Sequence, residues 1–143
     1  MGRIGAAFEL ALTAHAGQVD KAGAPYIGHV ARVAARVADG PEDEAARVVA
    51  LLHDVVEDTK VTLAEVEAQF GAEIAQAVDA LTRRKSEPGE SYYARVRANA
   101  LALVVKRADI DDNADPARLS LLPEETRNRL SRKYATARAA LEG

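Results

Sequence analysis

The segment ALLHDVVEDTKVT, residues 50–62, constrains the fold more than any other part of the chain. It follows directly on two valines, and such an apolar run is typical of a helix that enters a protein core. The same segment then carries His53 and Asp54, followed by Glu57 and Asp58. One imidazole and three carboxylates so close together are costly to bury without a partner. The fold must therefore supply a binding partner for this polar cluster.

The rest of the chain favours a single, all-helical domain over residues 1–143. A chain of 143 residues is long enough for one substantial core, and 48% of its residues are hydrophobic. Only 4% are aromatic and none is Trp, so the core must be built from Ala, Val and Leu. Ala and Leu are strong helix formers. We therefore expect a compact domain of about six to eight helices.

Several classes of protein are disfavoured by what the sequence lacks. Without cysteine there are no disulfides and no thiolate metal sites. Glu9 and His15 interrupt the N-terminal apolar stretch, which argues against a signal peptide, and no run is long enough to span a membrane. The net charge of −3 argues against a general nucleic-acid binder. We expect a cytoplasmic protein with no membrane or nucleic-acid partner, although a small anionic ligand is compatible with this charge.

Hydrophobic spacing, Gly and Pro positions and capping patterns predict where the helices lie. Gly40 followed by Pro41 predicts the end of one helix and the start of the next. Thr62 with Glu65 forms a capping-box pattern that predicts a helix start. Polar loops are expected at 20–28 and 83–91. The predicted helices cover residues 3–19, 29–38, 42–57, 62–70, 72–82, 92–113 and, after Pro123, a charge-rich final segment to 140.

Helical geometry sorts the polar residues of the opening segment into two pairs. His53 and Asp54 lie about 100° apart around the axis, close enough to reach one ion from a single turn. Glu57 and Asp58 lie one turn further on, on the same faces as His53 and Asp54 respectively. The spacing thus separates a candidate ligand pair from a candidate catalytic pair.

Two further positions could complete a metal site. His29 begins the second predicted helix, and Asp109 lies near the end of the apolar helix ALALVVKRADIDDN, with Asn113 four residues on along the same face. Two His and two Asp from three helices would make a mixed nitrogen and oxygen site that suits manganese, iron or zinc. A divalent ion in such a site lowers the pKa of bound water and polarises a phosphoryl oxygen.

Each of these residues taken alone has an ordinary structural interpretation. A single His is usually a hydrogen-bonded core or surface residue, and a His–Asp pair can be a satisfied polar pair at a helix end. Glu57 and Asp58 could be a solvated helix terminus, although acidic side chains there oppose the helix dipole. Asp109 could belong to a run of surface charges. The metal site is favoured by the combination, not by any one residue.

Together these motifs resemble the HD-domain metal-dependent phosphohydrolases, and specifically the hydrolase domain of RelA/SpoT-type enzymes and stand-alone small alarmone hydrolases. The likeness extends over most of the chain. A bare His–Asp pair is a weak signal, but LLHDVVEDT with an upstream PYIxH and a downstream KxADxxxN is specific. The segments that carry the resemblance are AHAGQ (14–18), PYIGH (25–29), ALLHDVVEDT (50–59), TLAEVEAQFG (62–71), ALT (80–82) and VKRADIDDN (105–113).

The resemblance implies a compact helical HD-domain fold and a role for each matching residue. The family removes the 3′-pyrophosphate of guanosine tetra- or pentaphosphate, leaving GDP or GTP, and its metal is usually manganese. The implied metal ligands are His29, His53, Asp54 and Asp109, with Glu57 and Asp58 activating or positioning the attacking water, Asn113 near metal and ribose, and Lys21 contacting the nucleotide. Arg83 is a further candidate cation for the phosphates, because it follows the LT motif.

The sequence departs from the family pattern at several of these positions. The usual RK loop motif reads DK, so that Asp20 stands where an arginine lies against the nucleotide. The usual KLADRLHN reads KRADIDDN, which places Arg107 and Asp112 beside retained residues, and Val30 replaces the Pro after the ligand His. An anion at position 20 should weaken the binding of a highly charged nucleotide unless another cation replaces the arginine.

Two alternatives to the alarmone hydrolase remain open. One keeps the metal chemistry but acts on another nucleotide with a 2′- or 3′-phosphate, NADPH being an example. The other is a non-catalytic helical sensing or interaction module. Tyr92 and Tyr93 could stack on a base, but a role in the core or in a lid is the simpler expectation. In both interpretations as an enzyme, the partner is a small-molecule nucleotide. The sequence does not determine the oligomeric state.

Overall fold

The structure, a computed structural model, describes residues 2–37 and 43–143, and it confirms the all-helical prediction. Within these residues eight helices have eight residues or more, and two have four. The eight longer helices agree with the expected number. They are α1 (Arg3–Ala14), α2 (Ile27–Arg36), α3 (Glu44–Leu52), α5 (Leu63–Phe70), α6 (Ala72–Leu81), α7 (Gly89–Arg97), α8 (Ala100–Asn113) and α10 (Glu124–Leu141), and the short ones are α4 (Val55–Asp58) and α9 (Pro116–Leu119).

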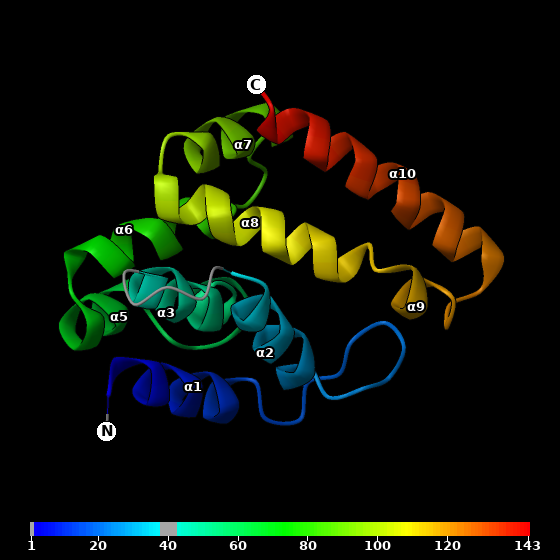
Figure 1. Ribbon diagram of the computed structural model, residues 1–143. Helices are drawn as coiled ribbons and strands as arrows, with labels where there is room; N and C mark the ends of the chain where they lie inside the picture. Colours follow the sequence, from blue (N-terminus) through cyan, green and yellow to red (C-terminus); the bar gives the residue numbers. More distant parts are fainter. Residues whose placement is uncertain (1, 38–42) are drawn as a thin grey trace.

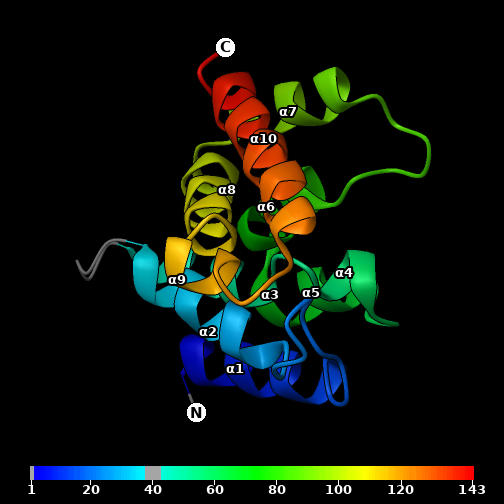
Figure 2. The ribbon, with the colours of Figure 1, turned by 90° about the vertical axis from the view of Figure 1, so that its right-hand side faces the viewer.

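Helix α8 runs through the middle of the molecule and connects two groups of helices (Figure 1). Helices α2 and α3 pack against it on one side, and α1 packs against α3 beyond them. On the other side α8 contacts α7 and α10. The chain begins beside α1 and ends beside α7, so the two ends lie on opposite sides of the fold in both views (Figures 1 and 2).

Helix α3 is the most deeply buried element. Every residue from Val48 to Leu52 is buried, and the surrounding core is made almost entirely of Ala, Val, Leu and Ile. Burying one Val or Leu side chain contributes about 1.5–3 kcal/mol. This packing fixes the helix whose C-terminal end carries His53 and Asp54.

The helical hydrogen bonding is interrupted at His53 and Asp54, where one continuous helix over 42–57 was expected. Helix α3 ends at Leu52, and Asp54 is the N-cap of the short helix α4. The apolar pattern runs on through the break, because Val55 is as buried as the residues of α3. Hydrophobic spacing alone could not have located it.

Three other boundaries differ from the prediction. The helix expected over 92–113 is two helices, because the Asn99 side chain accepts a hydrogen bond from the Ala102 N–H at 3.0 Å and starts α8. The first helix ends at Ala14 and not near 19, and Gly17 follows with φ +83°, a conformation that glycine adopts at little cost. Helix α9 was not expected; Asp115 caps it and Pro116 is its first residue.

Other sequence signals are confirmed. The Thr62 hydroxyl accepts from the Glu65 N–H at 3.2 Å, and the Glu65 carboxylate accepts from the Thr62 N–H at 3.3 Å, which completes the capping box. The expectations that fall on Ala38, the Gly40–Pro41 boundary and Glu42 lie outside the described residues. In the part of the chain that is described, no helix is both long and apolar enough to cross a membrane.

Candidate metal centre and active site

Three helical segments bring His29, His53 and Asp109 to one point in the interior. His29 lies in the first turn of α2, His53 caps the C-terminus of α3, and Asp109 lies in the last part of α8. One donor atom from each residue can be chosen so that all three lie within 4.8 Å of one another. All three residues are buried. The predicted convergence of two imidazoles and the α8 aspartate is therefore present.

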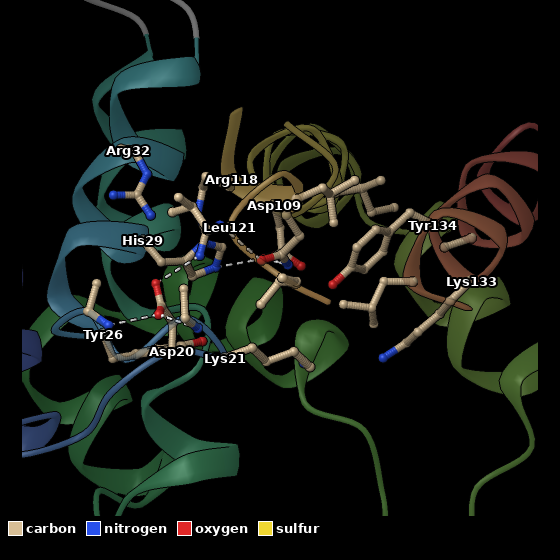
Figure 3. A pocket seen from close by; sticks show the side chains of 18 of the residues that line it. Asp20, Lys21, Tyr26, His29, Arg32, Asp109, Arg118, Leu121, Lys133 and Tyr134 are labelled. Atoms are coloured by element: carbon tan, nitrogen blue, oxygen red, sulfur yellow. Dashed lines mark hydrogen bonds and ion pairs between the residues drawn. The ribbon is translucent and has the colours of Figure 1, made fainter. Parts of the chain in front are cut away.

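The nitrogens of these imidazoles are oriented by different partners. His53 donates from Nδ1 to the Ala50 carbonyl at 2.6 Å, which leaves its Nε2 facing the cluster. His29 Nε2 lies 2.9 Å from Asp109 Oδ1, an interaction drawn in Figure 3. Both Nε2 atoms thus face the Asp109 carboxylate.

The donor set fits a divalent cation. His53 Nε2 lies 3.0 Å from Asp54 Oδ2 and 3.4 Å from Asp109 Oδ1, but it forms no hydrogen bond with either and is fully buried. A buried polar atom without a partner is costly. A metal ion bound by both Nε2 atoms and Asp109 would satisfy it, and mixed imidazole and carboxylate ligands suit manganese, iron or zinc.

Asp54 lies at the edge of this group. It is not one of the three residues whose donor atoms cluster most closely, but its Oδ2 is beside His53 Nε2. The Tyr26 hydroxyl donates a short hydrogen bond to the same Oδ2. Tyr26 belongs to the PYIGH motif, but the sequence analysis gave it no role. It holds the Asp54 carboxylate toward the cluster.

In the metal-free protein this cluster perturbs the pKa of each member. Burial lowers the pKa of both imidazoles, but the nearby carboxylates outweigh it: those of Asp109 and Asp112 raise the pKa of His29, and those of Asp54 and Asp109 raise the pKa of His53. Burial raises the pKa of Asp109, but the positive charge of Lys106 and the two neighbouring imidazoles hold it well below its usual range. A metal ion at this point would compete with protons for the two Nε2 atoms.

Two further residues hold the Asp109 carboxylate in place. Lys106 Nζ lies 3.0 Å from Asp109 Oδ2, and Asn113 donates from Nδ2 to Asp109 Oδ1 at 3.2 Å. Asn113 was predicted to lie near the metal and the ribose. The structure places it against a candidate ligand and on the wall of the adjoining cavity.

Glu57 and Asp58 lie on α4, and their surroundings differ. Glu57 Oε1 accepts a hydrogen bond from the Arg83 backbone N–H at 2.7 Å, which ties α4 to the loop after α6. Loss of solvent around the carboxyl, followed by the negative charges of Asp54 and Glu57, raises the pKa of Asp58 to about 6. A carboxyl group with a pKa near neutrality can accept and release a proton at physiological pH.

A cavity of about 410 Å³ adjoins the cluster. His29 and Asp109 form part of its wall, and Lys133 and Tyr134 of α10 face them across it (Figure 3). Its volume is within the usual range for small-molecule sites. Lys21, predicted to contact a nucleotide, also lines the cavity. Within the described residues neither Lys21 nor Lys133 forms an ion pair, so that both ammonium groups are available to an anion.

The structure also shows what faces Asp20, the residue in place of the usual arginine. Arg118 of α9 pairs with Asp20 Oδ2 at 3.0 Å. Asp20 Oδ1 accepts from the backbone N–H groups of Ala22 and Ala24 and so fixes the loop that carries Lys21. The anion at position 20 is thus neutralised within the protein, which the sequence analysis did not predict.

Other sequence candidates lie elsewhere. Arg83 does not line this cavity, and its guanidinium donates to the Glu87 carbonyl. Tyr92 is buried and donates from its hydroxyl to the Leu81 carbonyl, so it has the core role that was the simpler expectation. Tyr93 lines the cavity.

Lys133, Tyr134 and Arg118 were missed by the sequence analysis. An aromatic residue within a charge-rich helix was the available signal for Lys133 and Tyr134. Nothing in the local sequence identifies Arg118, because its partners Asp20 and Asp112 lie on other segments.

Comparisons with known proteins agree with this geometry. The model of a family described as HD domain matches residues 7–111. A guanosine-3′,5′-bis(diphosphate) 3′-pyrophosphohydrolase of Aquifex aeolicus is 33% identical over 135 residues, which are 89% of this chain and 19% of the relative. A probable GTP pyrophosphokinase of Mycobacterium leprae is 37% identical over 136 residues, which are 89% of this chain and 17% of the relative.

A solved structure of a metazoan ortholog of SpoT, described as hydrolysing ppGpp and playing a role in starvation responses, is also similar. It is 27% identical to this chain, and the two superpose with a TM-score of 0.73. The superposition covers 100% of this chain and 87% of the other. The chain spans only about a fifth of the length of the Aquifex relative.

Proposed function

The chain belongs to the HD domain family, and on that premise we propose that it is a divalent-metal-dependent nucleotide phosphohydrolase. The proposed reaction is hydrolysis of the 3′-pyrophosphate of guanosine tetra- or pentaphosphate, which yields pyrophosphate and GDP or GTP. The activity named for the Aquifex relative and that described for the metazoan structure support this substrate. A cytoplasmic location stays a prediction.

One observation carries the proposal: a buried group of donor atoms, suited to a divalent cation, adjoins a cavity whose wall carries two lysines that form no ion pair within the described residues. His29, His53 and Asp109 supply the donor atoms. Lys21 and Lys133 supply positive charge at the cavity wall. A phosphorylated nucleotide needs both features, since its phosphates must be neutralised while one phosphorus is attacked.

We assign the metal to His29, His53 and Asp109, with Asp54 as a fourth ligand, and we propose manganese as the ion. The orientation of both Nε2 atoms and the unsatisfied His53 Nε2 support the ligand assignment. When bound, such an ion supplies charge neutralisation of the phosphoryl oxygens and lowers the pKa of water. The choice of manganese rests on the family resemblance.

Asp58 is the proposed proton acceptor. At pH 7 a carboxyl with a pKa of about 6 is largely ionised and can take a proton from the attacking water. The water oxygen forms a bond to the phosphorus attached to the 3′-oxygen, and the bond between that phosphorus and the 3′-oxygen breaks. The water oxygen leaves on pyrophosphate and the 3′-oxygen is protonated. Glu57, held by the Arg83 N–H, keeps α4 in position and raises the pKa of Asp58.

Substrate binding is assigned to residues of the cavity wall. Lys21 and Lys133 would neutralise phosphates, and the Asn113 side chain, beside Asp109, lies where a ribose would approach the metal. The expected contact of Arg83 with a phosphate gains no support, because its guanidinium is engaged by the Glu87 carbonyl.

Pyrophosphate release from guanosine 3′,5′-bis(diphosphate) tests the proposal. Purified protein is stripped of metal, reloaded with Mn²⁺ and assayed against a nucleotide panel that includes NADPH. We expect manganese-dependent release of pyrophosphate, and a loss of roughly 10²-fold or more in the Glu57→Gln, Asp58→Asn double variant with metal still bound. Absence of pyrophosphate release from the metal-loaded wild type would remove the guanosine alarmone as the substrate.

The Asp20–Arg118 pair favours one alternative substrate class. Because Arg118 neutralises Asp20 inside the protein, the loop offers Lys21 alone, where the RK motif implied by the family resemblance would offer two cations. A nucleotide that carries a single 2′- or 3′-phosphate in place of a 3′-pyrophosphate would need fewer cations. Release of inorganic phosphate from NADPH, without release of pyrophosphate from the alarmone, would establish this alternative. Binding of nucleotides without turnover would indicate the non-catalytic module.

A further inference from the structure

Asp112 is a fully buried carboxylate one turn beyond Asp109 on α8. Its side chain meets three guanidinium groups and one imidazole, although a carboxylate needs fewer partners than that to be neutralised. Asp112 Oδ2 lies 2.7 Å from His29 Nδ1 and 2.8 Å from Arg118 Nη1. Asp112 Oδ1 accepts from Arg32 Nε at 2.9 Å and lies 3.5 Å from Arg36 Nε. The sequence analysis noted Asp112 only as a departure from the family pattern.

The contact with His29 determines which imidazole nitrogen remains for a metal ion. His29 Nε2 faces Asp109, and Nδ1 faces Asp112 on the other side of the ring. A neutral imidazole carries one N–H, and the hydrogen bond made by one nitrogen sets which nitrogen is free to bind a metal. Both nitrogens face a carboxylate, but a metal ion bound by Asp109 would take the Nε2 lone pair, and the Asp112 carboxylate beside Nδ1 would then keep the proton there.

We propose that Asp112 is a positioning residue for the metal centre, which holds His29 in its Nδ1–H form with Nε2 directed at the metal. The inference rests on the metal site of the proposed function but not on the identity of the substrate. Asp112 does not touch the metal or the nucleotide and acts through His29.

The arginines around Asp112 hold this carboxylate in position. Arg32 and Arg36 lie on the same helix as His29, so α2 supplies both the imidazole and two of the groups that fix its acceptor. Arg118 comes from α9 and also pairs with Asp20, in the loop that carries Lys21. A continuous set of ion pairs thus links the orientation of His29 to the loop at the cavity wall.

Mn²⁺ binding to the metal-free protein, measured by calorimetry without nucleotide, tests the role of Asp112. Asp112→Leu has a similar shape but offers no acceptor, and Asp112→Asn keeps an acceptor without the charge. Asp111→Asn is the matched control, because Asp111 is the neighbouring residue on α8 and its carboxylate pairs with Arg138 at the surface. We expect Asp112→Leu to weaken Mn²⁺ binding about 10- to 100-fold, the usual effect of losing an outer partner of a ligand. The Mn²⁺ affinity of Asp112→Asn should lie between those of Asp112→Leu and the control. Asp111→Asn should bind Mn²⁺ as the wild type does.

The outcomes separate this inference from the proposed function. Failure of the wild type to bind Mn²⁺ would overturn the metal site itself. Equal affinities in Asp112→Leu and Asp111→Asn would overturn the positioning role and leave Asp112 as an anchor for arginines. If Asp112→Leu does not fold, the imidazole ¹⁵N spectrum of the Zn²⁺-loaded wild type shows which nitrogen of His29 binds the metal. The signals can be assigned because the chain has only three histidines. A His29 ring that keeps its proton on Nδ1 supports the inference, and one bound to zinc through Nδ1 overturns it.

Discussion

Replacement of Asp58 by asparagine should remove the acidic limb of the pH–rate profile. In the metal-free protein, loss of solvent and the charges of Asp54 and Glu57 raise the pKa of Asp58 to about 6. A base with this pKa is about nine tenths ionised at pH 7 and about one tenth ionised at pH 5. If Asp58 takes the proton from water, kcat/KM of the wild type should fall by up to about ten-fold between these pH values. A bound cation lowers the pKa of a nearby carboxyl, so the midpoint should lie at or below pH 6.

Two single variants distinguish Asp58 from its neighbour. Asp58→Asn should lose roughly 10²-fold or more in kcat at pH 7.5, and its residual rate should no longer fall with the same midpoint. Glu57→Gln is the matched control, since glutamine keeps an oxygen that can accept from the Arg83 N–H. It removes one of the negative charges that raise the pKa of Asp58, so its acidic limb should move to lower pH.

The assay follows initial rates of pyrophosphate release from pH 5 to 8 at saturating Mn²⁺, with bound metal measured at each pH. Constant metal content ensures that the limb reports proton transfer and not loss of the ion. The reasoning is refuted if Asp58→Asn retains the wild-type rate, or if its residual activity shows the same acidic midpoint. A Glu57→Gln limb that moves to higher pH would contradict the electrostatic explanation of the raised pKa.

Three further predictions test the site and the fold. His53→Ala should lose bound Mn²⁺ and activity together, and unchanged metal content in elemental analysis would contradict its assignment as a ligand. Burial raises the pKa of Asp112, but hydrogen bonds from His29 and Arg32 and the charges of His29 and Arg118 outweigh it. They lower the pKa to about 2 in the folded state. Relative to an unfolded pKa near 3.9 this depression contributes about 2 kcal/mol of stability above pH 4. In urea titrations of the metal-free chain, Asp112→Asn should have a lower free energy of unfolding than the wild type, and this difference should become smaller as the pH falls from 4 toward 2. A difference that becomes larger over this range would contradict a lowered pKa of Asp112. Thr62→Ala removes one half of the capping box and should cost about 1 kcal/mol of unfolding free energy without changing activity.

Much of the fold follows from local sequence signals. The capping box at Thr62 and the turn at Gly71 set the limits of α5 and α6, because cap and turn residues act on their own backbone. The break at His53 has no capping side chain, and at Asn99 the capping signal is present but the apolar pattern runs across it. Buried apolar residues occur on both sides of each break, so that the hydrophobic pattern continues where the hydrogen bonding of the helix does not.

The sequence by itself determined which chemical groups this protein can bring to a metal and which helices carry them. His29, His53 and Asp109 could be named because motif spacing and helix position are properties of the chain. Only the tertiary structure decided that both Nε2 atoms face Asp109 and that Asp112 lies behind His29. It also decided that Arg118 neutralises Asp20 and that α10 closes the cavity with Lys133. The orientation of a side chain depends on partners from segments distant along the chain, and these are set by how the helices pack and not by local sequence.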